Sequence, residues 1–353
     1  MIVAYVNGEK YDKWTSARVS RSIDNAVGMF TLTTDSENFA VMEGDRIEII
    51  IDGETKLTGY VDTASGTNTD GNTSRTVTGR DALCDLVDSS LPDECKSVKS
   101  GSSLQGIISN VLKKLGLNME IINNAGTLKP FSSIELTAGE AGSGAFEFIT
   151  NLARKRGVFI NSDGLGNLVL FKMSTIITAF VVKTGEFLES SVSAGTAERF
   201  AKYCCKSQLQ IDGNYSEKTV YAKGYAKDRT ARDSRYFEFV AEESMSSAEC
   251  KARAEEEANI RRARSFEYRV KMQGHSLGGN VFDIKKGFSI KDEKLQVKGR
   301  FVIRSVDYSI DSDSGNYTDI VLAYADSYSV QAEMDQKALR KIDVAKYIRE
   351  ANK

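Results

Sequence analysis

The sequence is poor in the residues that metal centres and catalytic triads need. It has one histidine, His275, so neither a cluster of imidazole ligands nor a histidine paired with a recognisable nucleophile motif can be drawn. We interpret His275 as a residue of a loop or of the rim of a β-barrel. The sequence therefore predicts no enzyme, and we assign no catalytic, cofactor-binding or metal-binding residue.

Proline and low-complexity sequence are also scarce. The 353 residues include 2 prolines, and no Pro-rich or Gly/Ser-rich stretch marks a flexible linker. The length allows two to four domains at the usual ~100 to 200 residues each. We expect these domains to interleave and to form one rigid body.

No excess of charge and no long apolar run is present. The 47 basic and 49 acidic side chains nearly cancel, so global charge does not direct the chain to nucleic acid or to an anionic membrane. No apolar run approaches the ~20 residues of a membrane span, and the first ten residues lack the features of a secretory signal. We expect no stable membrane insertion.

The cysteines number five, which is odd, and Cys204 and Cys205 are adjacent in an expected strand. We interpret them as reduced core thiols of a protein made in a cytoplasm. A vicinal redox pair is the alternative.

What the sequence does contain is an internal repeat of strands and turns about 240 residues apart. The first copy covers residues 44–78 and the second covers residues 287–322. In both, alternating apolar residues are bounded by Gly, Asn and Asp, a pattern typical of half-buried antiparallel hairpins. This pattern suggests a small β-barrel that occurs twice, which would suit an adaptor between parts of different symmetry. The alternative is that any two β-meanders share such turns.

The expected fold class is α+β and mostly β, with two similar small β-barrels and interleaved α/β domains. We expect a first barrel at 1–88, an α/β domain with two helices and a β-hairpin at 89–175, a second barrel at 176–230 and 265–330, a helix-containing α/β insertion at 231–264, and a polar C-terminal helix or tail at 331–353. Asn7-Gly8 predicts a type I′ hairpin turn in the first barrel, because both positions must tolerate a positive φ.

Helix boundaries are visible at two capping patterns. Ser102 with Gln105 predicts the start of a helix that ends at Gly116, and Ser246 with Glu249 predicts a helix that runs to about Arg264. Two pairs in the second helix, Glu249 with Arg253 and Glu257 with Arg261, have the i, i+4 spacing of helical ion pairs. A further apolar stripe, closed by Gly157, predicts a helix before a hairpin at 158–171.

Three motifs that resemble functional sites have simpler explanations. Asp311 to Gly315 resembles a calcium loop, but its glycine is one position early and Leu322 replaces the required glutamate, so we interpret it as a hairpin turn. Gly164 to Asn167 is not followed by a helix and cannot bind phosphate at a helix N-terminus. The cluster Arg261-Arg262-Ala263-Arg264 ends a helix, where cations complement the helix dipole.

Several segments together resemble the baseplate hub of Mu-type contractile phages, which is akin to the T4 baseplate hub and to the late control protein D family. The matching segments are Trp14–Ile23, Gly28–Leu32, Thr58–Asp62, Gly79–Asp81, Asp85–Asp88, Ala153–Val158, Gly166–Leu168, Arg199 with Phe200 and Tyr203, and Arg261–Arg262 leading into Phe266–Glu267. The resemblance covers most of residues 1–325. The short polar C-terminus and His275-Ser276 depart from the family pattern.

The resemblance implies a structural, non-enzymatic protein of the virion tail baseplate that is made and assembled in the cytoplasm of the bacterial host. Such hubs are homotrimers that join a sixfold tail tube to a threefold spike. The implied partners are the spike or central puncturing protein and the tail tube or adjacent baseplate proteins. Phage DNA would pass through the ring without specific binding, and no cofactor is implied. The rival interpretation is a tail-associated peptidoglycan hydrolase that uses paired carboxylates.

Overall fold

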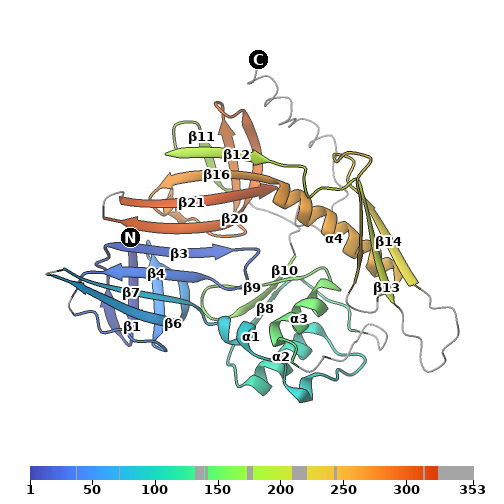
Figure 1. Ribbon diagram of the computed structural model, residues 1–353, viewed down its shortest axis with the longest axis horizontal. Helices are drawn as coiled ribbons and strands as arrows, with labels where there is room; N and C mark the ends of the chain where they lie inside the picture. Colours follow the sequence, from blue (N-terminus) through green and yellow to red (C-terminus); the bar gives the residue numbers. More distant parts are fainter. Residues whose placement is uncertain are drawn as a thin grey trace.

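The computed structural model describes residues 1–36, 38–70, 72–131, 139, 142–172, 178–208, 221–241, 245–312 and 315–324. Figure 1 shows the blue N-terminal strands and the red C-terminal strands side by side, with helices below them and a separate small sheet at one end. The expected tail at 331–353 lies outside the described residues, as do Asp313 and Ser314 of the turn that resembled a calcium loop.

The first half-sheet is formed by the N-terminal 81 residues. Its strands, in spatial order, are β2 (Glu9–Tyr11), β1 (Ile2–Val6), β5 (Arg46–Ile51), β6 (Glu54–Thr69), β7 (Asn72–Asp81), β4 (Met29–Thr34) and β3 (Ser16–Ser22). Buried and exposed residues alternate along β3, β4 and β5, because one face packs on the core and the other does not. Asn7 and Gly8 have φ values of 53° and 87°, as the type I′ prediction requires.

The second half-sheet repeats this arrangement with residues from the other end of the chain. Its strands are β11 (Thr178–Lys183), β19 (Gly287–Asp292), β20 (Val297–Asp311), β21 (Gly315–Tyr324), β16 (Phe266–Gln273) and β12 (Glu189–Ala194), and a small hairpin of β17 (Ser276–Leu277) and β18 (Asn280–Val281) lies beside it. Because β20 and β21 pair down to Asp311 opposite Gly315, the calcium-like sequence is part of a hairpin.

The repeat extends to the register of the strands. One row of paired residues crosses four strands of each half-sheet: Val19, Phe30, Gly79 and Val61 in the first, and Val192, Tyr268, Leu322 and Ile303 in the second. Immediately after this row, β6 contains one extra residue, Asp62, and β20 contains one extra residue, Arg304. A β-bulge at the same place in both copies is hard to attribute to general resemblance between β-meanders.

The two half-sheets are not separate closed barrels in the described residues. Instead, β3 pairs with β20 and joins them into one 13-stranded sheet, in which β11 and β19 branch from β20. The copies differ in the strands that extend from β6 and β20. In the first copy β5 pairs with β6, and β1 pairs antiparallel with β5. In the second copy β19 pairs with β20, but β11 pairs parallel with β19. Sequence periodicity identifies strands but does not specify their long-range partners. We expected each half-sheet to close into a barrel, and the structure instead joins the two half-sheets through β3 and β20.

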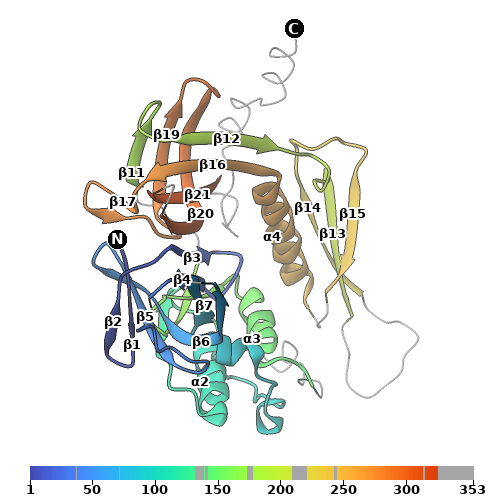
Figure 2. The same ribbon diagram turned by 60° about the vertical axis from the view of Figure 1, so that its left-hand side comes forward.

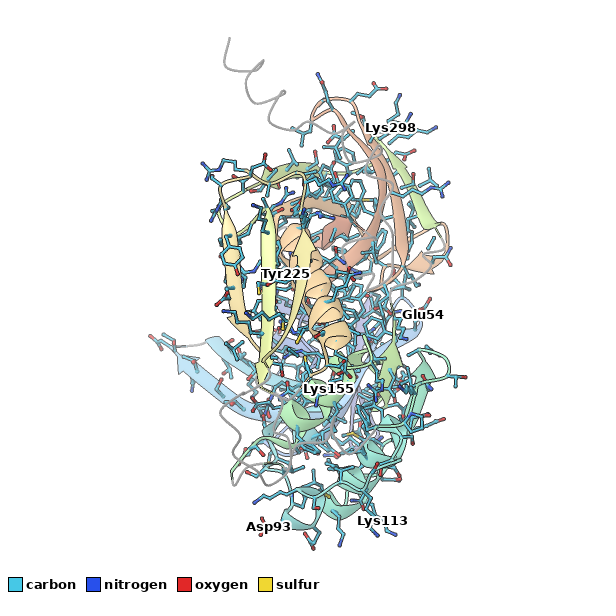
Figure 3. All side chains as sticks on the ribbon, turned by 90° about the vertical axis from the view of Figure 1, so that its right-hand side faces the viewer. Glu54, Asp93, Lys113, Lys155, Tyr225 and Lys298 are labelled. Carbon is cyan, nitrogen blue, oxygen red and sulfur yellow. The ribbon has the colours of Figure 1, made fainter. Side chains whose placement is uncertain are left out.

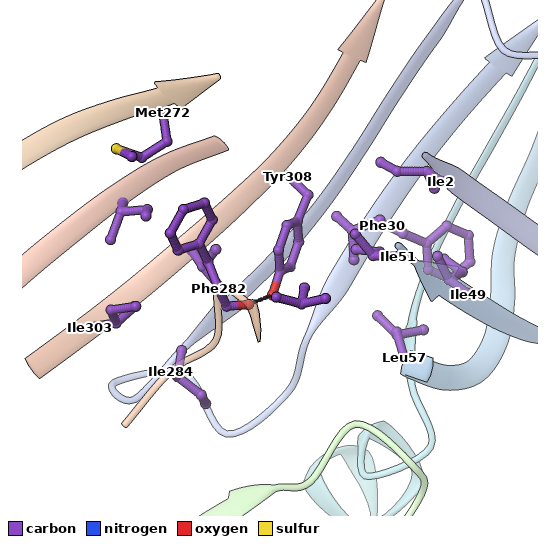
Figure 4. Packing of buried hydrophobic residues seen from close by; sticks show 14 of the residues in the cluster. Ile2, Phe30, Ile49, Ile51, Leu57, Met272, Phe282, Ile284, Ile303 and Tyr308 are labelled. Carbon is purple, nitrogen blue, oxygen red and sulfur yellow. Dashed lines mark hydrogen bonds between the residues drawn. The ribbon is translucent and has the colours of Figure 1, made fainter. Parts of the chain in front are cut away.

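A shared hydrophobic core supports the joined halves. Figure 4 shows Phe30 and Ile49 of the first half-sheet near Tyr308 and Phe282 of the second, all buried in one cluster. The Tyr308 hydroxyl donates a hydrogen bond to the Phe282 carbonyl, which satisfies a polar group in the middle of this apolar region.

The α/β region lies beneath the first half-sheet (Figure 1). It contains α1 (Cys84–Asp88), the 3₁₀ turn η1 (Asp93–Cys95), α2 (Leu104–Leu115), α3 (Ala145–Arg154) and a sheet of β8 (Ile121–Asn124), β10 (Leu168–Phe171) and β9 (Phe159–Ser162). Gly116 ends α2 in the left-handed conformation, as predicted. The N-cap is Ser103 and not Ser102, because the Ser103 hydroxyl accepts the Gly106 N–H and the expected box with Gln105 does not form.

A third unit consists of α4 (Ser247–Ser265) and a sheet ordered β14 (Tyr221–Lys227), β13 (Lys202–Gln208) and β15 (Tyr236–Val240). The domain boundaries in the structure differ here from those expected from the sequence. Strands β13 and β14 fall within 176–230, which was expected to belong to the second barrel, but they pack on α4 and not in the second half-sheet. At the start of α4 the predicted capping box forms: Ser246 Oγ accepts the Glu249 N–H, and the Glu249 carboxylate accepts the Ser246 N–H. Glu257 pairs with Arg261 as predicted, at 2.7 Å, whereas Glu249 pairs with Arg156 at 3.8 Å and not with Arg253.

Candidate assembly surface

The junction between the half-sheets is a regular antiparallel ladder. Its pairs run from Ser22 opposite Ser305 to Ser16 opposite Asp311, and the Ile23 N–H donates to the Arg304 carbonyl just beyond the Ser22–Ser305 pair. Across the ladder, Arg18 donates to the Asp307 carboxylate at 3.0 Å, and the Ser20 hydroxyl donates to the same oxygen. Two repeats of the same unit are thus joined edge to edge through backbone hydrogen bonds.

The face of the joined sheet that turns away from the core is polar and balanced in charge around this junction. A shallow hollow of about 330 Å³ lies across β4, β3, β20, β21 and β16. Three of its arginines pair with carboxylates: Arg18 with Asp307, Arg269 with Glu267, and Arg304 with Asp24. This face therefore offers a nucleic acid no unopposed row of cations near the junction.

A buried ion network holds the two half-sheets and the α/β region together. Asp283 accepts Arg21 Nη1 at 2.7 and 2.9 Å and Lys56 Nζ at 3.0 Å, while Arg21 Nη2 donates to the Ser162 carbonyl at 3.1 Å. The side chains of Arg21 and Lys56 are each 5% exposed. Burial opposes ionisation of Asp283, but the two cations outweigh it and hold the pKa of this carboxyl below its ordinary value.

Other polar contacts reinforce the same three-way junction. Asn161 Nδ2 donates to the carbonyls of Ser22, Ile23 and Asn25, which fixes the connection between β3 and β4 on β9. Lys285 Nζ lies 4.5 Å above the Phe171 ring, and burial together with the nearby Arg21 charge lowers the pKa of Lys285 to about 8. These contacts support the expectation of one rigid body.

Sequence analysis did not identify this network, although one signal was present. Arg21 continues the inward series Ala17 and Val19 along β3, so a charged residue stands at a core position. Its partner Asp283 is remote in sequence and follows no motif. A charged side chain at an inward strand position predicts a buried partner but does not identify it.

The two glycine motifs quoted for the family resemblance lie where strands approach closely. A Cβ on Gly59 would lie 1.9 Å from the Arg80 carbonyl oxygen, and one on Gly79 would lie 2.1 Å from the Tyr60 carbonyl oxygen. Asp81 accepts the Gly28 and Leu83 N–H groups, and burial raises the pKa of its carboxyl to about 6. These residues build the fold.

The remaining residues singled out from the sequence are structural as well. Cys204 and Cys205 are buried free thiols, as are the chain's other three cysteines. In the arginine cluster, Arg262 pairs with buried Asp228 at 3.2 Å, and the Arg261 guanidinium lies 4.1 Å from the centre of the Phe237 ring. The cluster thus ties α4 to its sheet and does not form a free basic patch.

His275 lies in the bend between β16 and β17, as the loop interpretation expected, but its side chain is buried. It is 1% exposed, its Nδ1 lies 3.0 Å from the Thr318 hydroxyl, and burial lowers the pKa of the imidazole to about 4. The bend is held against the chain that follows β18, because the Phe282 N–H donates to the His275 carbonyl.

This environment predicts a pH-dependent stability. The unfolded chain takes up a proton on His275 below its ordinary pKa of 6.5, but the folded chain does so only near pH 4. The free energy of unfolding should therefore fall as the pH decreases from 6.5 to 4, by up to about 3 kcal/mol from this residue. Denaturant unfolding of the wild type and of His275→Gln at pH 7 and pH 4.5 measures the difference. Because the chain has one histidine, its single imidazole NMR signal gives the pKa directly, and a midpoint near 6.5 would refute the prediction.

A second uncovered surface lies on the small sheet opposite α4. Figure 3 shows this sheet in front of the helix, with Tyr225 on it. Tyr225, Tyr236 and Val240 are exposed there, and the neighbouring cross-strand pairs are Lys202 with Lys227 and Lys206 with Lys223. Glu238 of the neighbouring strand β15 pairs with Lys206, so a carboxylate offsets part of this positive charge.

Within the described part of the chain, no group of three or more His, Cys, Asp or Glu side chains is placed to hold a metal ion. None of its helices combines the length and the apolar character needed to cross a bilayer.

Comparison with known proteins agrees with the geometry. Residues 1–81 match the family described as Mu phage baseplate assembly protein GpP-like, N-terminal, and residues 83–172 match the family described as baseplate hub protein gp44-like, second domain. Over 348 residues the chain is 24% identical to the baseplate hub protein gp44 of Escherichia phage Mu, covering 94% of this chain and 89% of gp44.

Solved structures share the fold over nearly the whole chain. The 43 kDa tail protein of prophage MuSo2 from Shewanella oneidensis aligns with a TM-score of 0.80 at 24% identity, over 92% of this chain and 98% of that protein. The E. coli c3393 protein, a type VI secretion component described as similar to the T4 tail proteins gp27 and gp5, aligns with a TM-score of 0.55 at 10% identity, over 92% and 78% of the two chains. With its first two domains in the family's order, the chain is a homologue of Mu gp44 and a structural, non-enzymatic baseplate hub protein of phage-tail type.

Proposed function

We propose that three copies of this chain form a ring at the centre of a contractile tail baseplate, assembled in the cytoplasm of the bacterial host. Each copy contributes two half-sheets, so the ring presents six similar units to a sixfold tail tube while keeping threefold symmetry for the spike. The observation that carries this proposal is the register-matched repeat, with bulges at Asp62 and Arg304. Repetition at this level makes the two half-sheets geometrically equivalent as contact surfaces.

The polar face of the joined sheet suits the wall of a DNA channel. Its arginines at the junction pair with Asp24, Glu267 and Asp307, so DNA phosphates would meet matched charges and not a basic track. DNA could then pass without being held, since affinity for DNA depends chiefly on the number of phosphates that cations neutralise.

This proposal predicts that the hub does not retard double-stranded DNA in a gel, even at low salt. Replacing both Glu267 and Asp307 by Lys leaves Arg269 and Arg18 unopposed and adds two cations, so this variant should bind DNA with an affinity that falls steeply as salt increases. DNA binding by the wild type that equals that of the E267K/D307K variant would contradict the proposed channel wall.

The proposed partners are the spike and the tail tube or an adjacent baseplate protein. The type VI secretion component with the same fold is described as similar to the T4 tail proteins gp27 and gp5, which supports partners within a tail. The rival function, peptidoglycan hydrolysis, is tested by cell-wall zymography, in which a purely structural hub leaves the substrate intact.

A further inference from the structure

We propose that the outer face of the small sheet formed by β14, β13 and β15 binds an acidic surface of a partner protein. Figure 2 shows this sheet on the side of α4 that faces away from the two half-sheets. The face is therefore separate from the junction between the half-sheets, and the inference holds with or without the ring.

The outer face follows from the alternation of side chains along each strand. Tyr203 and Cys205 of β13 are buried in one apolar cluster with Cys250 and Ala254 of α4. The residues that alternate with them point away from the helix, and the strand register arranges them in a grid. Its rows across the three strands are Lys227, Lys202 and Tyr236, then Tyr225, Cys204 and Glu238, then Lys223, Lys206 and Val240.

Positive charge predominates on this grid. Of its four lysines, only Lys206 forms an ion pair within the described chain, with Glu238. Lys202, Lys223 and Lys227 are exposed, and Lys202 is directly opposite Lys227. Because like charges opposite each other repel, carboxylates from a partner would relieve this pair as well as bind to it.

Apolar surface accompanies the charge. Tyr225, Tyr236 and Val240 are 59%, 51% and 66% exposed, whereas Cys204 between them is 1% exposed. The neighbouring side chains thus cover Cys204 and form a continuous surface. Tyrosine is enriched at the centres of protein interfaces, where surrounding charges steer an oppositely charged partner. An apolar anchor and a charge pattern for a partner to match are therefore present on one face.

The position of Glu238 favours a protein partner over nucleic acid or lipid. Glu238 lies in the middle row of the grid, beside Cys204, and accepts hydrogen bonds from Lys206 and the Tyr236 hydroxyl. The backbone of nucleic acid and the headgroups of anionic lipids present uniform negative charge, which this carboxylate repels. An acidic protein surface can place carboxylates against the lysines and a hydrogen-bond donor against Glu238.

Fluorescence anisotropy with a labelled acidic peptide, in which pairs of glutamates flank leucines, tests the inference on the full-length protein. The wild type should bind this peptide with an affinity that falls as salt increases. Lys202→Glu with Lys227→Glu should weaken binding roughly tenfold or more, because both substitutions place carboxylates against carboxylates. Tyr225→Ala should weaken binding about threefold and leave its salt dependence unchanged, because the ring contributes contact area and no charge.

The matched control is Lys113→Glu with Lys298→Glu, which changes the net charge equally. Both lysines are exposed, and Figure 3 shows them away from the small sheet. Because salt screens remote charges, this control should bind the peptide within about twofold of the wild type. Carbodiimide coupling, which joins a carboxylate to an amine that it touches, then locates the peptide by mass spectrometry: the unpaired lysines of the grid should be coupled first.

Three results would overturn the inference. Equal binding by the wild type, the K202E/K227E variant and the control would show that the grid is not a binding face. Tighter binding of oligothymidylate or of phosphatidylglycerol vesicles than of the peptide, lost in the K202E/K227E variant, would assign the face to a ligand that carries phosphate. Loss of the oligomer in that variant, measured by light scattering, would make the face a contact between copies of this chain. A wild-type monomer that still binds the peptide at the grid would contradict the ring alone.

Discussion

Replacing Asp283 by Asn is expected to destabilise the protein by about 3 kcal/mol, at the lower end of the ~3 to 5 kcal/mol found when one partner of a buried ion pair is removed. The substitution keeps the shape of the side chain but removes the charge that Arg21 and Lys56 share. Both cations would remain buried without it. The loss is at the lower end because Lys56 keeps an ion pair with Glu54 at 2.7 Å and Arg21 keeps the Ser162 carbonyl.

The control for this prediction is Asp307→Asn. Asp307 also pairs with an arginine across the two half-sheets, but Arg18 is 64% exposed, so the expected loss is less than about 1 kcal/mol. Urea unfolding at neutral pH compares the three proteins. Equal stability of the Asp283 and Asp307 variants would show that the buried network does not hold the junction.

Replacing Gly59 by Ala is expected to cost about 3 kcal/mol or more, or to prevent folding. The new methyl carbon would lie 1.9 Å from the Arg80 carbonyl oxygen and 2.6 Å from the Asp81 Cα. Both atoms belong to the backbone of β7, so no side-chain rotation relieves the overlap and the strands must separate. The expected result is a lowered thermal midpoint or insoluble protein.

Gly66→Ala is the matched control, because Gly66 lies in the same strand β6 and has open space around it. Its thermal midpoint should equal that of the wild type or exceed it slightly, since alanine reduces the entropy of the unfolded chain. If the Gly59 and Gly66 variants unfold at the same temperature, the close approach of β6 and β7 is not a requirement of the fold.

Local signals in the sequence predicted local structure well. The turn at Asn7-Gly8, the end of α2 at Gly116 and the capping box of Ser246 with Glu249 each depend on a few adjacent residues, and each is confirmed. The strand repeat is also confirmed, because alternation and turn residues are preserved in both copies. The resemblance to a baseplate hub drew on the same segments.

What the sequence could not predict depends on long-range pairing. The contact of β3 with β20 joins residues at opposite ends of the chain, and neither strand differs in pattern from one that closes a barrel. Likewise β13 and β14 have strand patterns that do not say which sheet they join. The partners of Arg21 were hidden for the same reason, since Asp283 is close to it only in the fold.

The measurement that tests the central claim most directly is the absolute mass of the purified full-length protein by light scattering over a range of concentrations. The proposed ring predicts a mass of three times the 38.8 kDa chain. A mass of one chain at every concentration, unchanged when the spike protein is added, would contradict it.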